Sequence, residues 1–201
     1  MLTSSGLVPH RDHREIAEAA IRGGAAAVQL RAPELVDEEL LPLAMALADR
    51  CREEGVMFLV NNRLDVAAAS KADGAHVGQS DDIAGARSAI GPDRVLGVSI
   101  RGPEDIPAAE AAGADYLGVT VWETATKPEA RPLGLEGLKS TADATDLPIV
   151  GIGGIDASNA REVIEAGAVG VAVISSVGGA ADPVSATRAL VEAVRTAKAA
   201  T

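Results

Sequence analysis

Short apolar runs alternate along the chain with longer stretches in which apolar residues return every three or four positions. The short runs predict strands and the longer stretches predict helices, because side chains change face at every residue of a strand and return after about 3.6 residues in a helix. The predicted strands span residues 1–3, 26–30, 56–60, 74–77, 95–99, 116–119, 149–152 and 170–174. The predicted helices span residues 12–23, 37–54, 64–70, 83–90, 103–112 and 156–167. This alternation predicts an α/β protein with a parallel sheet.

Local signals mark the ends of several helices. Asp12, with Glu15 three positions later, has the pattern of a capping box, and Asp156 is a predicted cap for the helix after residue 155. A small-residue step that contains glycine precedes four strands: Gly24-Ala25, Ala72-Asp73-Gly74, Gly113-Ala114-Asp115 and Gly167-Ala168. Glycine there ends a helix in the left-handed conformation, which costs other residues more. With eight strands counted, the repetition predicts one domain over residues 1–201, a single (β/α)8 TIM barrel; a doubly wound open sheet is the alternative.

The last predicted strand–helix–strand unit carries small residues at both strand ends. Gly153-Gly154 follows one strand and Ser175-Ser176 follows the next. In a parallel arrangement both ends lie at one edge of the sheet, where bare N–H groups and a helix N-terminus favour an anion. TIM barrels usually place a phosphate after the seventh and eighth strands. We therefore expect a phosphate site here; the alternative is that the glycines only make tight turns.

Composition narrows the class of protein. The chain is 47% hydrophobic but 1% aromatic, so Val, Ile, Leu and Ala must build the core, as in parallel strands covered by helices. A net charge of −11 argues against nucleic acid and anionic membrane surfaces as partners, because either requires a basic face. The single cysteine, Cys51, predicts a packed thiol rather than a nucleophile. No leader pattern or membrane span is recognised, so we expect a cytoplasmic protein.

Polar residues collect after the predicted strands, which in a barrel places them at one end. They are Gln29, Arg31, Asn61, Asn62, His76, Gln79, Asp81, Ser99, Thr124, Thr126 and Lys127. Arg31 and Lys127 are cations that can hold phosphate, the first as a fork and the second as a point charge. Asp81 is a candidate Mg²⁺ ligand or, alternatively, a helix cap.

Three further side chains carry two interpretations each. His76 lies one residue before the end of its strand, which favours a structural histidine over a catalyst. Ser99 has no base beside it in the sequence, so a hydrogen-bonding role is favoured over a nucleophile. Trp122 either walls a flat heterocycle or anchors its loop.

Several separated motifs follow one another along the chain: VQLRAPEL, LVNNRLD, DGAHVGQSD, LGVS, DYLGV, TATKPEA, IGGI and AVISS. In this order they resemble the thiamine phosphate synthase family over nearly the whole chain. The resemblance implies a TIM-barrel transferase of thiamine biosynthesis that joins a pyrimidine methyl diphosphate to a thiazole phosphate, with Mg²⁺ on the diphosphate. Diphosphate leaves first, and the thiazole nitrogen then captures a pyrimidine methyl cation.

The resemblance also implies residue roles. The pyrimidine diphosphate would be held by Gln29, Arg31, Asn61, Ser99 and Lys127, and the thiazole phosphate by Thr124, Thr126, Gly154, Ile174 and Ser175. Gln79 and Gly153 complete the expected substrate-binding set, and Asp81 and Asn62 occupy the metal positions. Arg31, Ser99 and Lys127 are the expected catalytic residues of a synthase.

Two positions depart from the family pattern. Pro33 stands where the family usually has Lys, and Asn62 stands where it has a second metal-binding Asp. The segment VWETATK also matches, without a gap, a loop of the related thiazole tautomerases, which bind only the thiazole. Their catalytic histidine corresponds to Thr120 here, so a tautomerase would need Glu123 for proton transfer.

Three hypotheses therefore stand: a thiamine phosphate synthase first, a tautomerase-like enzyme second, and a non-catalytic phosphate-binding barrel third. All three expect small phosphorylated molecules as partners. A homo-oligomer stays open, because the sequence does not give the oligomeric state.

Overall fold

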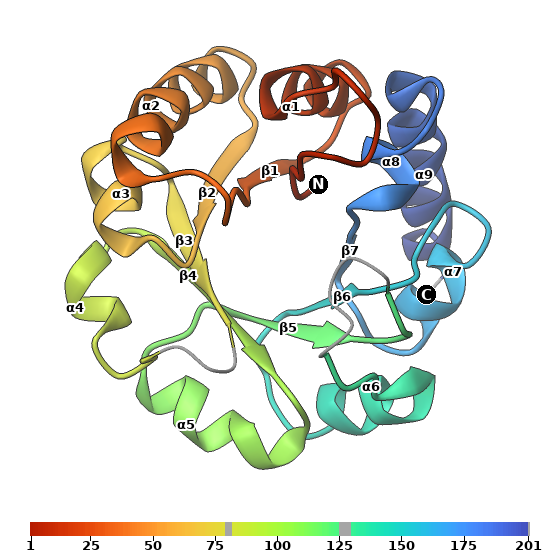
Figure 1. The fold of residues 1–201 in the computed structure, drawn as a ribbon. Helices are drawn as coiled ribbons and strands as arrows, with labels where there is room; N and C mark the ends of the chain where they lie inside the picture. Colours follow the sequence, from red (N-terminus) through yellow and green to blue (C-terminus); the bar gives the residue numbers. More distant parts are fainter. Residues whose placement is uncertain (79–81, 125–129, 201) are drawn as a thin grey trace.

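The computed structural model describes residues 1–78, 82–124 and 130–200. At its centre lies a parallel sheet of seven strands in the order β1 to β7, so that each strand pairs with its neighbour in sequence. The strands are β1 (Ala27–Leu30), β2 (Met57–Asn61), β3 (Gly74–Val77), β4 (Val95–Ile100), β5 (Tyr116–Thr120), β6 (Ile149–Ile152) and β7 (Gly170–Ala172). The sheet curls into a TIM-barrel-like α/β fold (Figure 1). This sequential order excludes the doubly wound alternative, whose strand order reverses at a switch point.

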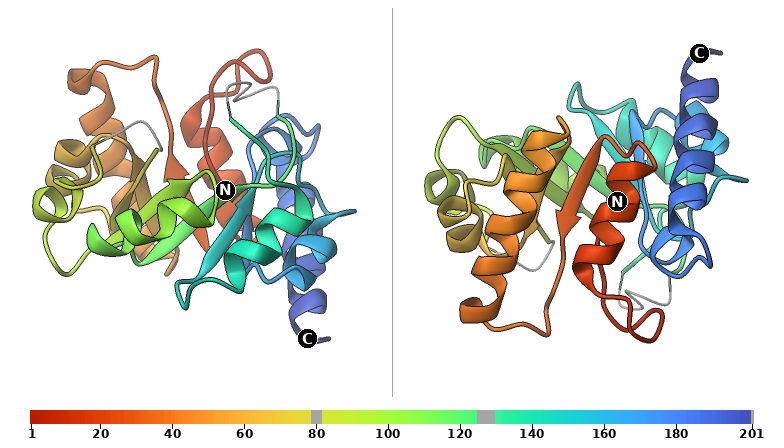
Figure 2. Two further views of the ribbon diagram at one scale, coloured as in Figure 1. Left: turned by 90° about the horizontal axis from the view of Figure 1, so that it is seen from below. Right: turned by 90° about the horizontal axis from the view of Figure 1, so that it is seen from above.

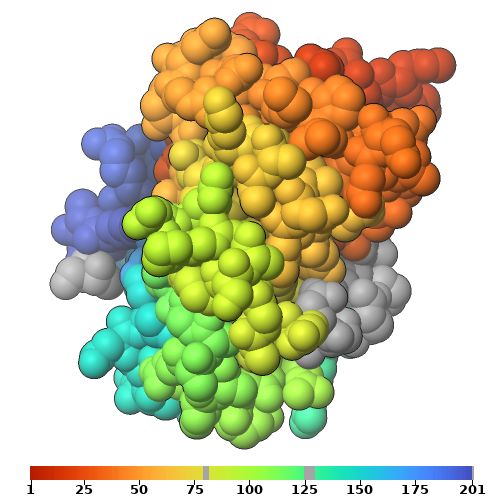
Figure 3. Space-filling model, turned by 90° about the vertical axis from the view of Figure 1, so that its left-hand side faces the viewer, coloured from red at the N-terminus to blue at the C-terminus, as the bar shows by residue number. Residues whose placement is uncertain are grey.

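Helices cover the outer face of the curled sheet (Figures 1 and 2). They are α1 (His13–Arg22), α2 (Asp37–Glu53), α3 (Leu64–Ala69), α4 (Ala86–Ile90), η1 (Pro103–Asp105), α5 (Ile106–Ala111), α6 (Gly134–Ala142), α7 (Ala160–Glu165), α8 (Ser175–Gly178) and α9 (Pro183–Lys198). Helices α2 to α5 follow one another across the outer face seen in Figure 3. None of the helices within the described residues has the length and apolar character that crossing a membrane requires.

The two faces of each strand have different surroundings. Val28 and Leu30 of β1 and Val60 of β2 are at most 1% exposed and belong to the apolar core. Gln29 and Asn61, which alternate with them, line an interior pocket. Because successive side chains point to opposite faces of a sheet, the same strands supply both the core and the candidate site.

The segment before α1 lies between the first and last strands. Leu2 forms an isolated parallel bridge with Gln29 rather than a full strand. The Thr3 amide donates to the Gln29 carbonyl at 2.9 Å, and the Gln29 amide donates to the Met1 carbonyl at 2.8 Å. The Leu2 amide donates to the carbonyl of Val173, directly after β7, at 2.9 Å. Residues 1–3 therefore contact both edges of the seven-stranded sheet.

The seven strands predicted from residue 26 onward are present, each with ends within two residues of the prediction. The last of them is shorter than predicted and ends at Ala172, and α8 begins at Ser175, where no helix was predicted. The helix predicted over residues 83–90 begins only at Ala86, and that over 103–112 is divided into η1 and α5. Helices α6 and α9 form where the pattern assigned no element.

The predicted cap at Asp156 is wrong, since α7 begins at Ala160. The Asp156 carboxylate accepts the backbone N–H of Ser158 at 2.7 Å and its hydroxyl at 2.6 Å. The side-chain oxygen of Asn159 in turn accepts the Asp156 N–H at 2.9 Å. These bonds stabilise a local turn ahead of the helix, which competes with helix capping for the same oxygen atoms.

The glycine helix stops are confirmed at three of the four steps, where Gly24, Gly113 and Gly167 have φ of 88°, 77° and 107°. At the fourth step Lys71, with φ 59°, takes the left-handed conformation after α3. Gly74 lies instead within β3, where a Cβ would overlap the backbone of Val95 on the neighbouring strand. This glycine serves close strand packing rather than a helix end.

The capping box at α1 is confirmed and makes a testable contribution to stability. The Asp12 carboxylate accepts the Glu15 N–H at 2.9 Å, and the Glu15 carboxylate accepts the Asp12 N–H at 2.9 Å. We expect Asp12→Ala to lower the free energy of unfolding by about 1 kcal/mol, because one helix N–H loses its partner. Urea unfolding measures this. Asp146→Ala, at an exposed position without a cap, is the control, and an equal effect of both changes would contradict the prediction.

Candidate functional site

A pocket of about 520 Å³ lies at the carboxyl ends of the strands. Residues from the described ends of all seven strands line it, together with Leu2 and the first residues of α8. Open ends of parallel strands are where TIM-barrel proteins bind their ligands. The pocket is thus the candidate site.

The structure brings most of the sequence-predicted residues together. Those that line the pocket are Gln29, Arg31, Asn61, Asn62, Ser99, Thr124, Gly153, Gly154, Ile174 and Ser175. Glu123 is exposed and does not line it. The predicted residues Gln79, Asp81, Thr126 and Lys127 lie outside the described residues.

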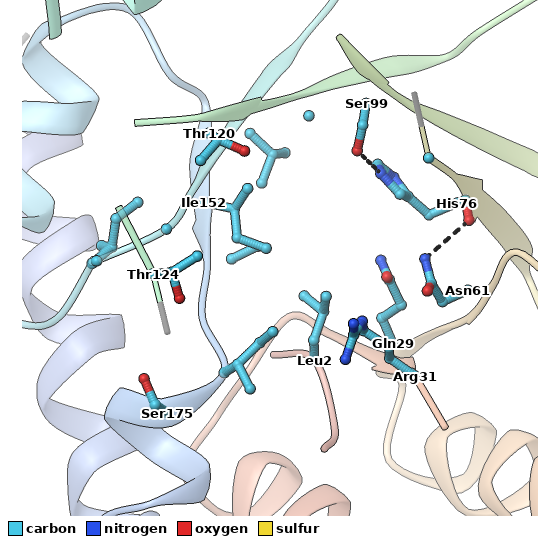
Figure 4. A pocket seen from close by; sticks show the side chains of 18 of the residues that line it. Leu2, Gln29, Arg31, Asn61, His76, Ser99, Thr120, Thr124, Ile152 and Ser175 are labelled. Carbon is cyan, nitrogen blue, oxygen red and sulfur yellow. Dashed lines mark hydrogen bonds between the residues drawn. The ribbon is translucent and has the colours of Figure 1, made fainter. Parts of the chain in front are cut away.

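One side of the pocket is polar and carries a cation. Figure 4 shows Gln29, Arg31, Asn61, His76 and Ser99 on this side. Gln29 is 7% exposed, and its Oε1 is buried with no hydrogen-bond partner in the described part of the chain. Among the described lining residues Arg31 is the one arginine or lysine, and its guanidinium forms no ion pair with a described residue. Within the described part of the chain, the Gln29 Oε1 therefore has no hydrogen-bond donor and the Arg31 guanidinium has no ion-pair partner.

A buried hydrogen-bond chain supports the Arg31 backbone. Its N–H donates to Oγ1 of Thr3 at 3.2 Å, and Nδ1 of His13 lies 2.8 Å from the same oxygen. Nε2 of His13 lies 2.8 Å from the carboxylate of Glu34, which follows Arg31 in the same loop. Burial opposes ionisation of Glu34, but hydrogen bonds from Ser5 and His13 hold its pKa below the usual value. Helix α1 is thereby tied to the loop that carries the cation.

The end of β2 is fixed to β3 by two bonds to one carbonyl. The side-chain amide of Asn61 donates to the His76 carbonyl at 3.2 Å, and the backbone N–H of Asn62 donates to it at 2.8 Å. Asn62 has φ 61°, a conformation that Asn tolerates better than most residues. The chain turns sharply there, which places the Asn62 amide at the pocket.

His76 joins two other strands inside the barrel-like sheet. Its Nε2 lies 2.8 Å from Oγ of Ser99 on β4, and its Nδ1 lies 2.9 Å from the hydroxyl of Tyr116 on β5. Ser99 therefore has an imidazole beside it in space, although the sequence places none beside it. Burial raises the pKa of Tyr116, so its hydroxyl stays protonated.

The other side of the pocket is built from β5 to α8. Figure 4 shows Thr120, Thr124 and Ser175 there. Gly153 and Gly154 have φ of 92° and 66°, and a Cβ on Gly153 would lie 2.6 Å from the carbonyl oxygen of Trp122. Both glycines are thus required by conformation, and Gly153 also by space.

The position of Trp122 decides between its two predicted roles, walling a heterocycle or anchoring its loop. It is partly buried against the core and does not line the pocket. Its backbone N–H donates to the Gly153 carbonyl at 3.3 Å, and its side chain lies behind Gly154. Trp122 therefore anchors the loop after β5 rather than walling the cavity.

Several lining residues were missed by sequence reasoning. They are Leu2, Tyr116, Gly118, Thr120, Val150, Ile152 and Ala172. Most share the alternation of the strands and stand two residues from a predicted site position or from another inward residue. The two-residue period of a strand was therefore the sequence signal that could have identified them. Leu2 carries no such signal, because its place depends on contacts distant in sequence.

A TIM-barrel-like sheet with a two-sided polar pocket at its strand ends defines an α/β protein that binds small molecules at this edge. The family model described as thiamine monophosphate synthase matches residues 1–177, and the chain belongs to this family. Pro33, where the family usually has Lys, is exposed and does not line the pocket.

Known proteins support the same membership. The thiamine-phosphate synthase of Moorella thermoacetica is 49% identical over 187 residues, covering 92% of this chain and 89% of that protein. That of Natronomonas pharaonis is 47% identical, covering 92% and 88%. The structure of a thiamine phosphate pyrophosphorylase from Pyrococcus furiosus is 38% identical, with a TM-score of 0.89 and coverage of 98% and 94%. A 3-hexulose-6-phosphate synthase from Salmonella typhimurium, 18% identical with a TM-score of 0.74, shares the fold.

Proposed function

We propose that the chain is a thiamine-phosphate synthase, a transferase of thiamine biosynthesis that joins an aminopyrimidine methyl diphosphate to a thiazole phosphate. The family membership and the names of its relatives support this activity. The bond between the pyrimidine methylene carbon and the diphosphate oxygen breaks, and diphosphate leaves with the electron pair. The thiazole nitrogen then forms a bond to the methylene carbon, so the new cationic centre is the thiazolium.

The observation that carries the proposal is the buried Oε1 of Gln29, which has no hydrogen-bond partner among the described residues. An unmade hydrogen bond on a buried carbonyl is costly, and a bound donor removes that cost. The exocyclic amino group of the pyrimidine is such a donor. Arg31 on the same side can hold the diphosphate through its fork of N–H groups. Gly153, Gly154 and Ser175 on the other side are suited to the thiazole phosphate.

Mg²⁺ is part of the proposal. Asn62 lines the pocket and has an amide oxygen, a hard ligand suited to this ion, and Asp81 is the expected carboxylate. The described residues hold no cluster of three or more His, Cys, Asp or Glu side chains that could bind a metal alone. This fits an ion held mainly through the substrate, since Mg²⁺ in phosphate sites takes one or two protein ligands. When bound, it would offset negative charge on the leaving diphosphate.

Further predictions from the sequence accompany this function. We propose that residues 1–3 act as the eighth strand of a closed barrel, which the hydrogen bonds of Leu2 and Thr3 to both sheet edges support. A single domain over residues 1–201, a cytoplasmic location and a homo-oligomer stay predictions. Lys127, Thr126 and Gln79 keep their expected substrate-binding roles.

No structural observation favours the tautomerase. Its catalytic histidine is replaced by Thr120, and Glu123 is exposed away from the pocket. A general base has to lie within hydrogen-bond reach of the proton that it takes.

The direct test incubates the protein with both substrates and follows thiamine phosphate by chromatography, with excess Mg²⁺ or with EDTA. We expect equal amounts of thiamine phosphate and diphosphate with Mg²⁺ and a loss of at least about 100-fold with EDTA, since the leaving group then keeps its charge unscreened. Absence of condensation in excess Mg²⁺ would contradict the proposal. Metal-independent conversion of a thiazole phosphate isomer, without pyrimidine, would point to the tautomerase.

Asn62 makes a separate prediction about metal affinity. A neutral amide oxygen adds no charge to the site, so Mg²⁺ binding should be weak and should depend on bound diphosphate. We expect Asn62→Asp to tighten Mg²⁺ binding by about 10-fold, because a second carboxylate favours the cation. Calorimetry with and without inorganic diphosphate measures it. Equal affinity of the wild-type and Asn62→Asp proteins would exclude position 62 as a ligand.

A further inference from the structure

Three side chains from neighbouring strands form one hydrogen-bond chain within the site. The Tyr116 hydroxyl lies 2.9 Å from Nδ1 of His76, and Nε2 of His76 lies 2.8 Å from Oγ of Ser99. His76 is 9% exposed, and all three residues line the pocket. Figure 4 shows the imidazole of His76 directed at Ser99. The hydrogen-bond chain therefore runs from the buried hydroxyl of Tyr116 through His76 to the hydroxyl of Ser99 at the cavity.

Two glycines make room for this chain. A Cβ on Gly97 of β4 would overlap both the His76 ring and the Tyr116 ring. A Cβ on Gly118 of β5 would lie 3.0 Å from Cε1 of His76 and 3.5 Å from Oγ of Ser99. Glycine within a strand weakens the strand, and it commonly marks a place where another group must approach the backbone closely. Here that group is the imidazole, which the two strands enclose in one orientation.

The direction of the protons follows from Tyr116. Within the described residues its hydroxyl has no hydrogen-bond partner other than His76, and burial raises its pKa, so it keeps its proton. The described residues offer that proton one acceptor, Nδ1 of a neutral His76. A neutral imidazole that accepts at Nδ1 carries its own proton on Nε2 and donates it to Oγ of Ser99. The Ser99 hydroxyl, already an acceptor, is left to donate its proton into the cavity.

We propose that Tyr116 and His76 are positioning residues that fix Ser99 as a hydrogen-bond donor to the diphosphate of the pyrimidine substrate. This inference rests on the proposed synthase function for the identity of the ligand. A diphosphate oxygen accepts hydrogen bonds and gains negative charge as the carbon–oxygen bond breaks, so a donor fixed in advance acts most strongly at that moment. A ligand group that can only donate a hydrogen bond would instead face the hydroxyl hydrogen of Ser99, so its binding there would be disfavoured.

The first experiment requires no substrate. In protein carrying isotope-labelled histidine, NMR distinguishes the protonated ring nitrogen from the bare one, and His76→Gln identifies the signals of His76 among the three histidines. We expect the proton of His76 on Nε2. In Tyr116→Phe we expect a mixture of both tautomers, because Nδ1 loses its donor. A proton found on Nδ1 in the wild-type protein would overturn the proposal, whether or not the protein is a synthase.

The second experiment measures steady-state condensation. We expect Tyr116→Phe to lower kcat about 10-fold with little change in KM for thiazole phosphate, and Ser99→Ala to lower kcat about 100-fold. In the Ser99→Ala background, Tyr116→Phe should have no further effect, because it acts through Ser99. Full additivity of the two changes would overturn the positioning role. Inactivity of the wild-type protein would refute the synthase function and leave the NMR result to decide the tautomer.

Thr141→Val is the matched control for loss of a buried hydroxyl. Thr141 on α6 is fully buried, donates to the Gly137 carbonyl at 2.8 Å and does not line the pocket. We expect it to lower the melting temperature without changing kcat. If Tyr116→Phe behaves in the same way, its hydroxyl is structural and the proposal fails.

Discussion

Replacing Arg31 by alanine should lower kcat/KM for condensation by about 100- to 1000-fold, the loss typical of a preorganised charged donor. Arg31 is the one arginine or lysine among the described lining residues, and no described carboxylate pairs with it. In a chain of net charge −11, diphosphate binding depends on such local cations. Pro33 supplies none, so we expect Arg31 to carry more of this task here than where the family has Lys.

Steady-state kinetics with the pyrimidine diphosphate varied measures the Arg31→Ala effect. Arg31→Lys should recover only part of the activity, because an ammonium group keeps the charge but not the fork of donors. Binding of thiazole phosphate alone, followed by calorimetry, should be unchanged, since Ser175, which we propose to hold the thiazole phosphate, lies on the other side of the pocket (Figure 4). Arg161→Ala, which removes an exposed arginine paired with Glu165 on α7, is the control. A loss below about 5-fold would contradict a diphosphate-holding role for Arg31.

The fold was largely predictable because its signals are local. The Asp12 capping box and the left-handed glycines at 24, 113 and 167 depend on a few neighbouring residues, and each was confirmed. The wrong predictions occur where two local structures compete. Asp156 could cap a helix or close a turn with Ser158, and the turn is formed. Residue type alone does not decide such a competition.

The candidate site was predictable only where residues end a strand or follow it directly. Arg31 and Gly153 directly follow their strands, Gln29 and Asn61 lie in the last two residues of theirs, and all four line the pocket. The pairing of His76 with Ser99 was not predictable, because 23 residues separate them in sequence and the parallel register of β3 and β4 brings them together. Likewise, the support of Arg31 by His13 joins a helix to a loop through Thr3.

The contacts of Gly153 also could not be predicted from the residues next to it in the sequence. The sequence suggested either a phosphate site or a tight turn, and the structure shows that the turn exists: φ is 92° and the Trp122 carbonyl lies close by. The close approach depends on the loop after β5, which leaves no trace in the residues around Gly153. The Gly153→Ala variant tests whether this turn also binds phosphate.

Gly153→Ala should raise KM for thiazole phosphate by about 10- to 100-fold. A methyl group at this position would lie 2.6 Å from the Trp122 carbonyl and 3.0 Å from Cγ2 of Thr120, so the loop after β6 must move. Alanine at φ 92° is also strained. Since Gly153 and Gly154 form one turn, the backbone N–H groups that we propose to bind the phosphate would shift, and a displacement of about 1 Å at an oriented site can cost about 100-fold.

Calorimetric titration with thiazole phosphate measures the Gly153→Ala effect without turnover. Gly24→Ala is a matched control, because Gly24 has a similar φ of 88° but a Cβ there meets nothing within 4 Å, and it does not line this pocket. Both changes should lower the melting temperature through backbone strain, and Gly153→Ala should lower it further because its methyl group also meets the Trp122 carbonyl. Only Gly153→Ala should weaken thiazole phosphate, while the affinity for inorganic diphosphate with Mg²⁺ stays within about 2-fold, since Arg31 lies on the opposite side. Equal thiazole phosphate affinity in both variants would show that Gly153 only makes a turn, and the phosphate would then have to be bound elsewhere.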